Sequence, residues 1–176
     1  MTKSIFIIDE DPAQCASILS DQHLRSQLEW TRDVLSASLA LRGIGDRMLG
    51  VGTKHGGSLA TWAAKDWDNF MWLVFYGMAL VEEHDRRFGT MHPAMAGFFV
   101  AGNLGHLLHE GEPMIPADWP WSEAAEGYNH FSAFNAYQNV LRDECEAAAD
   151  KDHSPTWTNT YPPNWLADTG EVVYRD

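Results

Sequence analysis

The stretch TWAAKDWDNFMWLVFYGMALVEEHDRRFG, residues 61–89, decides the fold class. Ser58, shortly before it, can cap a helix, and Gly89 at its end can stop one. We therefore expect one long helix over residues 58–88. The apolar run inside it, Phe70 to Val81, has twelve residues, whereas a helix that crosses a bilayer needs about twenty. No membrane span is expected.

Further helical patterns flank this stretch. Apolar residues recur at helical spacing, prolines occupy positions that suit first turns, and glycines mark stops. No internal repeat is present, and the length suits one domain. We expect a mostly α, compact single domain over residues 1–176, with a short extended segment at 4–8 and helices at 12–20, 23–41, 93–108 and from about 122 or 128 to 150. Loops are expected at 45–57 and 110–121, and an irregular, aromatic packed tail at 153–176.

Charge is distributed unevenly along the chain. The net charge is −13, yet residues 1–65 contain seven basic and seven acidic residues, so the whole excess lies in residues 66–176. A bound polyanion is therefore expected against residues 1–65. Cys15 and Cys145 have no metal-type spacing, and no export signal opens the chain. We expect two reduced, buried thiols and a cytoplasmic location, which is the host cytoplasm if the protein is viral.

Several segments resemble one family in the same order along the chain. They are IFIIDEDP near the start, SDQHL with Asp21, Gln22, His23 and Leu24, the central stretch quoted above, AYQNVLRDE and PPNWL. This pattern resembles bacteriophage proteins similar to pyrimidine-dimer DNA glycosylases of the endonuclease V type. The family places lysines where this chain has Gln22 and Ser26, and a glutamate where it has Trp30. Glu29 lies one residue earlier, about 100° around a helix.

The resemblance implies a small helical protein that acts on DNA. Such glycosylases attack the sugar carbon with an N-terminal amine while a carboxylate assists, and they excise a damaged base before nicking by elimination. Thr2 provides that amine if Met1 is removed. Related enzymes in phages with modified thymines handle modified bases, so a transferase or hydrolase acting on such a base is a neighbouring possibility.

Candidate catalytic and binding residues begin at the start of the second helix. Asp21 can cap this helix, and His23 can act as a general acid or contact a phosphate. The alternative is a simple cap beside an exposed histidine. Arg25, Glu29 and Arg32 share one helix face, where two arginines can bind phosphates and the carboxylate can stabilise a cationic sugar. The alternative is a solvated row of ion pairs.

Other candidates lie in the centre of the chain. Trp62 and Trp72 can stack on an extruded base and Asn69 can read its edge, or the two tryptophans are core residues. Lys54 lies in a glycine-rich loop that lacks the ending of a phosphate-binding loop. An i, i+4 pair and a histidine are expected to support the site from beneath: Glu83, Arg87 and His92. His106 and His109 have no third ligand partner, so neither a metal nor a cofactor is expected.

The sequence favours one function and leaves two alternatives open. The favoured function is an enzyme that resembles pyrimidine-dimer DNA glycosylases and processes a damaged or modified thymine-type base, with duplex DNA or an extruded base bound through residues 1–65. The first alternative is an acidic, catalytically degenerate relative that binds a basic protein partner through its C-terminal two-thirds, as a DNA mimic does. The second is a modification enzyme acting on a modified base or a free nucleotide.

Overall fold

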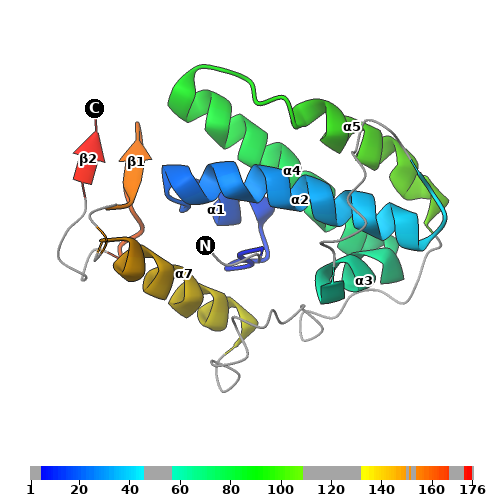
Figure 1. Cartoon of the computed structure of the whole chain (residues 1–176), viewed down its shortest axis with the longest axis horizontal. Coiled ribbons are helices and arrows are strands. Elements are labelled where there is room, and N and C mark those ends of the chain that lie inside the picture. Colours follow the sequence, from blue (N-terminus) through cyan, green and yellow to red (C-terminus); the bar gives the residue numbers. More distant parts are fainter. Residues whose placement is uncertain are drawn as a thin grey trace.

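The computed structural model describes residues 5–45, 57–108, 132–149, 151, 154–166 and 173–175. Helices dominate these residues, which confirms the predicted mostly α class (Figure 1). Among the described helices, none combines the length and the apolar composition needed to cross a membrane. The elements are α1 (Pro12–Ser17), α2 (Asp21–Leu41), α3 (Gly57–Lys65), α4 (Trp67–Phe88), α5 (Met95–Leu104), the short 3-10 helix η1 (Gly105–Leu107), α7 (Ala133–Ala149), β1 (Thr156–Thr158) and β2 (Val173–Arg175).

Helix α2 begins two residues earlier than the periodicity predicts. Ser20 has extended backbone and its hydroxyl accepts a hydrogen bond from the His23 N–H, so Ser20 rather than Asp21 is the N-cap. This leaves Asp21 in the first turn, where a carboxylate interacts favourably with the helix dipole. Leu28 and Leu35, seven residues apart on one face, are fully buried. Helix α2 therefore lies with one face in the core and the opposite face outward.

The prediction of one long helix over residues 58–88 is wrong, because the helix is broken at Asp66. Its backbone is extended (φ −145°, ψ 147°), and its carboxylate accepts a hydrogen bond from the Asp68 N–H, 2.8 Å away. Asp66 thereby ends α3 and caps α4. The predicted stop is confirmed, since Gly89 adopts a left-handed φ of 64° and its N–H donates to the Asp85 carbonyl.

Helices α4 and α5 pack closely at a glycine. A Cβ added to Gly77 would lie 2.6 Å from the ring of Phe98, so only glycine lets α5 approach α4 here. The predicted helix over residues 93–108 is found as α5 followed by η1. The described part of the predicted segment at 4–8, residues 5–8, is buried, and it pairs with no strand among the described residues. The C-terminal helix is found within residues 133–149, and its predicted start lies outside the described residues.

The tail contains more regular structure than the sequence predicts. Within the predicted irregular tail, strand β1 pairs in parallel with β2, with Trp157 opposite Tyr174, which the sequence does not predict. Figure 1 shows β1 beside the N-terminal end of α2. Trp157 is fully buried, and its indole N–H donates to the carbonyl of Ile18 at 3.1 Å. The described part of the tail is thus fastened to the helical core. The predicted loops at 45–57 and 110–121 lie largely outside the described residues.

Candidate functional site

Asp21 is a buried residue at the start of α2, and its carboxylate binds residues of the tail. Its carboxylate accepts hydrogen bonds from the Thr156 hydroxyl at 2.9 Å, from the Thr158 hydroxyl at 2.8 Å and from the Thr158 N–H at 3.1 Å. It also accepts one from the Arg87 guanidinium at 3.0 Å. Burial by itself raises the pKa of Asp21. The hydrogen bonds from Thr158, Arg87 and Thr156 together outweigh burial, so the pKa of Asp21 lies below its ordinary value.

Arg87 completes this network from α4. Its side chain is fully buried, and its Nε donates to Glu83 at 2.7 Å, which confirms the predicted i, i+4 pair. The guanidinium also donates to the carbonyls of Leu19 and Ser17 at 2.7 and 2.9 Å. Arg86 binds the same Glu83 carboxylate at 2.6 Å. These contacts hold the start of α2, the end of α4 and the tail together.

His23 joins α2 to α7. Its ring Nδ1 lies 2.7 Å from the Ser20 hydroxyl, and its Nε2 lies 3.1 Å from the Glu144 carboxylate. Phe6 packs edge-on against the ring at 5.5 Å. The His23 residue is 3% exposed, and both ring nitrogens have protein partners. The arrangement favours a positioning role for His23, and Asp21 is engaged in the same way.

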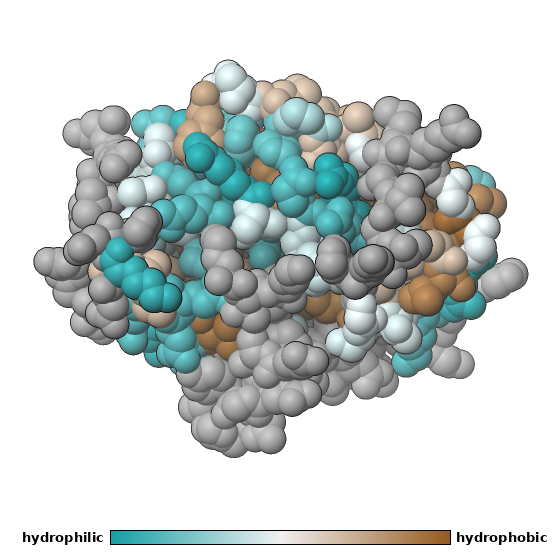
Figure 2. All heavy atoms as spheres, viewed as in Figure 1, coloured by the Kyte–Doolittle hydropathy of each residue, from teal (hydrophilic) through white to brown (hydrophobic). Residues whose placement is uncertain are grey.

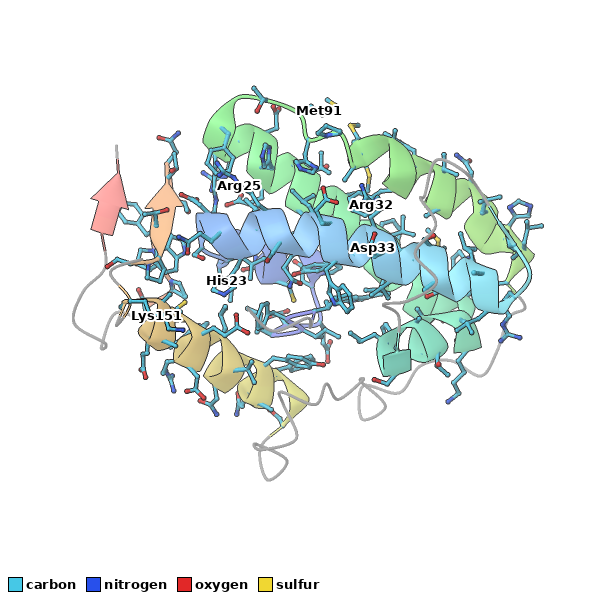
Figure 3. All side chains as sticks on the ribbon, in the orientation of Figure 1. His23, Arg25, Arg32, Asp33, Met91 and Lys151 are labelled. Atoms are coloured by element: carbon cyan, nitrogen blue, oxygen red, sulfur yellow. The ribbon has the colours of Figure 1, made fainter. Side chains whose placement is uncertain are left out.

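The predicted face of Arg25, Glu29 and Arg32 is present and accessible. Figure 3 shows Arg25 and Arg32 on the side of α2 that faces Met91, whereas His23 points toward the opposite side. Arg32 binds Glu29 at 2.7 Å and Asp33 at 3.3 Å. The Arg25 guanidinium lies over the Phe88 ring, 4.6 Å from its centroid. Hydrophilic side chains gather over α2 in this view (Figure 2).

Two histidines extend this face. His92, in the connection between α4 and α5, contacts the ring of His84 at a centroid distance of 5.1 Å. His84 Nδ1 lies 2.8 Å from the Thr90 carbonyl, so it carries a proton. Partial burial is the main reason why the pKa of His92 is lower than usual. His84, Arg32 and Arg25 lower the pKa further, while Glu29 acts in the opposite direction. We call Arg25, Glu29, Arg32, His84, Phe88 and His92 the Arg25 face.

The aromatic candidates lie apart from these contacts and are buried. Trp72 stacks on Tyr76 at 5.4 Å, and its indole N–H donates to the Glu10 carbonyl at 2.8 Å. Asn69 donates to the carbonyl of Trp62 at 2.9 Å. The burial of Trp62 and Trp72 therefore agrees with the alternative that both are core residues. The Oδ1 of Asn69 is left as a buried acceptor without a partner among the described residues.

Thr2 and Lys54 lie outside the described residues, as does His109. Within the described ranges, no group of three or more His, Cys, Asp or Glu side chains is arranged to hold a metal ion. Cys15 and Cys145 are buried and free, as predicted.

Sequence reasoning misses several partners in these networks. Glu144 and the threonines of β1 lie more than 120 positions from the residues they bind, so no local spacing indicates them. Phe88 and His84 are four residues apart on α4 and close to His92, and that spacing is the one signal that points to them. No protein-family model matches the sequence, and comparisons with curated proteins and with solved structures find no match.

Proposed function

We propose that the protein binds DNA through the Arg25 face and processes a damaged or modified thymine-type base of that DNA. The two parts of this proposal have different support. The geometry of the Arg25 face supports binding to phosphate, and the resemblance to pyrimidine-dimer glycosylases supports chemistry on the base.

One observation carries the binding part. Among the arginines whose side chains are described, Arg25 is the one with neither an ion pair nor a hydrogen bond, although it is held in place over Phe88. A guanidinium fixed on an aromatic ring keeps its N–H groups available for a phosphate, and it loses little rotamer freedom on binding. In a chain of net charge −13, an exposed arginine without a carboxylate partner is suited to recognise an anion.

Arg32 and Glu29 lie on the same face, and there we propose that the Glu29 carboxylate assists the reaction at the sugar. Arg32 lies seven residues after Arg25, so the two guanidinium groups lie about two turns apart along α2. Glu29, between them and exposed, is bound to Arg32. In the proposed reaction an amine attacks the sugar carbon, the glycosidic bond breaks, and the base leaves with its bonding electrons and takes up a proton. A carboxylate beside the sugar stabilises the positive charge that develops there.

In the proposed function Asp21 and His23 have a positioning role. Both side chains are engaged with other parts of the protein and fix the start of α2, from which the Arg25 face begins one turn later. The amine remains the prediction made from the resemblance, with Thr2 as its candidate.

The test uses duplexes that contain undamaged DNA, a thymine dimer, an abasic site or 5-hydroxymethyluracil, at low salt and with borohydride present. We expect binding that weakens steeply with salt and a trapped covalent adduct on a damaged or modified duplex.

Arg25→Gln should weaken binding to all duplexes and reduce the salt dependence by about one phosphate contact. Lys65→Gln, which removes an exposed charge on α3, is the matched control and should leave binding unchanged. Duplex affinity and salt dependence that are unchanged by Arg25→Gln overturn the proposed face, and absence of an adduct on every duplex overturns the amine chemistry.

A second candidate function has its own observation. Helix α7 carries Asp143, Glu144 and Glu146 in its C-terminal half, with no basic residue in its last turn. Negative charge is unfavourable at that end of a helix dipole, so a cationic partner would stabilise α7. If no duplex binds, the acidic-partner function is tested by competition, in which the protein should displace DNA from a basic DNA-binding protein. Failure to compete excludes a DNA mimic.

A further inference from the structure

His92 is connected to Arg25 through the rings of His84 and Phe88. Its Nδ1 accepts a hydrogen bond from the Ala94 N–H at 3.2 Å, so in the neutral ring the proton lies on Nε2. His84 is held in the opposite tautomer by Thr90, with the proton on Nδ1. The two rings meet edge to face at 5.1 Å, and Phe88 links them to Arg25, because it lies 4.8 Å from His84 and under the Arg25 guanidinium.

The charged and titratable groups that face His92 come from α2 and α4. They are Arg25, Arg32 and Glu29 from α2, with His84 from α4. Arg32 is already bound to two carboxylates, those of Glu29 and Asp33. The local charge is therefore close to balanced while His92 is neutral. A proton on His92 gives the face a net positive charge, and an anion at the face would stabilise that proton.

We propose that the Arg25 face is a proton-linked phosphate site, in which a phosphate group contacts both Arg25 and His92 and its binding takes up one proton at His92. The inference deepens the proposed function and rests on it in one respect, namely that the phosphate belongs to DNA. The linkage itself concerns any phosphate group, so inorganic phosphate can test it separately.

The linkage has a defined sign. In the free protein the pKa of His92 is lower than usual because of partial burial and of His84, Arg32 and Arg25. An anion near the ring favours the charged form, so the bound state has the higher pKa. Affinity for phosphate should therefore be highest below the pKa of the free protein and should fall as pH rises through the pKa of the complex. A shift of one unit between the two states corresponds to about a tenfold change in affinity.

The experiment follows the His92 ring by NMR across pH 5 to 8.5 in the whole chain. The signal is assigned with His92→Gln, and the probes are a short duplex and inorganic phosphate, compared with chloride at equal ionic strength. We expect either probe to move the His92 titration to higher pH, by about one unit. The duplex affinity should fall about tenfold over the same range. His92→Gln should make the affinity independent of pH in this range. His106→Gln, an exposed histidine on η1, should change nothing.

The outcomes separate this inference from the proposed function. Duplex binding with an unmoved His92 titration overturns the inference and leaves the DNA proposal standing. Absence of duplex binding, with a His92 titration moved by inorganic phosphate, overturns the DNA proposal and supports the phosphate site. An unmoved titration with both probes overturns the site, and a shift that persists in Arg25→Gln overturns the joint contact.

Discussion

Asp21 Oδ1 and Arg87 Nη1 lie 3.0 Å apart in the interior, and this ion pair joins the first turn of α2 to the last turn of α4. Asp21→Asn keeps the shape of the side chain and removes its charge. Breaking a buried pair leaves an unbalanced charge, so we expect the free energy of unfolding to fall by about 3 kcal/mol. Urea unfolding measures it. Asp85→Asn, at an exposed position on α4, is the control and should change stability by less than about 0.5 kcal/mol.

The lowered pKa of Asp21 also predicts that the free energy of unfolding decreases at acidic pH. The folded-state pKa of Asp21 is lower than the ordinary 3.8, because the hydrogen bonds from Thr158, Arg87 and Thr156 outweigh burial. Its contribution is therefore fully present above the unfolded-state pKa and is lost as pH falls through the lowered one. Urea unfolding at a series of pH values below 5 should show a shallower loss of stability for Asp21→Asn than for the natural sequence. Equal slopes would show that Asp21 does not carry the effect.

The close contact between Gly77 and Phe98 predicts that a side chain at position 77 disturbs the packing of α5 on α4. The Cβ of Gly77→Ala would lie 2.6 Å from the Phe98 ring, so α5 must shift, and we expect a loss of about 1–3 kcal/mol by thermal unfolding. Gly102→Ala is the matched control, because its Cβ meets only Val74 at an ordinary 3.4 Å. That change should be neutral or stabilising by up to about 1 kcal/mol. If both substitutions behave alike, close packing at Gly77 is not the cause.

Gln27 predicts a measurable coupling within the core. Its Oε1 accepts hydrogen bonds from the Tyr76 hydroxyl at 3.1 Å and from the Phe6 N–H at 3.4 Å. Gln27→Leu leaves the buried Tyr76 hydroxyl without this acceptor, so we expect a loss of about 2 kcal/mol. Adding Tyr76→Phe should recover part of the loss, and a double-mutant cycle by urea unfolding measures the coupling. Purely additive losses would contradict the contact.

The burial of Cys15 and Cys145 predicts that both thiols react slowly with a thiol reagent in the folded protein. Burial raises the pKa of both Cys15 and Cys145 to about 12. Only about one thiol in ten thousand is then ionised at pH 8, and the thiolate is the reactive form. A thiol reagent should therefore react with neither cysteine on the timescale of a free thiol, and with both after unfolding in urea. Rapid labelling of the folded protein would show that one of the two thiols is accessible.

The helices were predictable where a local signal was sufficient. The periodicity of residues 23–41 and the stop at Gly89 depend on neighbours in the chain, and both are found. The break at Asp66 was missed because apolar spacing continues across it, although Asp66 with Asp68 two residues later is a capping signal. The short β1–β2 pairing was missed because it joins segments about 15 residues apart within a tail rich in proline.

The site was predictable only in part, for the same reason. Arg25, Glu29 and Arg32 lie on one face because helical spacing places them there. The burial of Asp21 and His23 depends on Thr158 and Glu144, whose distance along the sequence carries no pattern. Spacing therefore indicated which residues lie together on α2, and only the tertiary contacts separated the exposed face from the buried network.

The fastening of β1 to α2 has a consequence for synthesis on the ribosome. A nascent chain that ends before residue 154 already contains Asp21 and Arg87, yet it lacks the threonines that Asp21 binds and the indole of Trp157 that is buried against Ile18. The contacts of helices α1 to α5 in the interior are therefore incomplete until residues 156–158 have been synthesised. A chain that stalls before these residues leaves the Asp21 carboxylate without the threonine hydrogen bonds that it accepts in the folded protein.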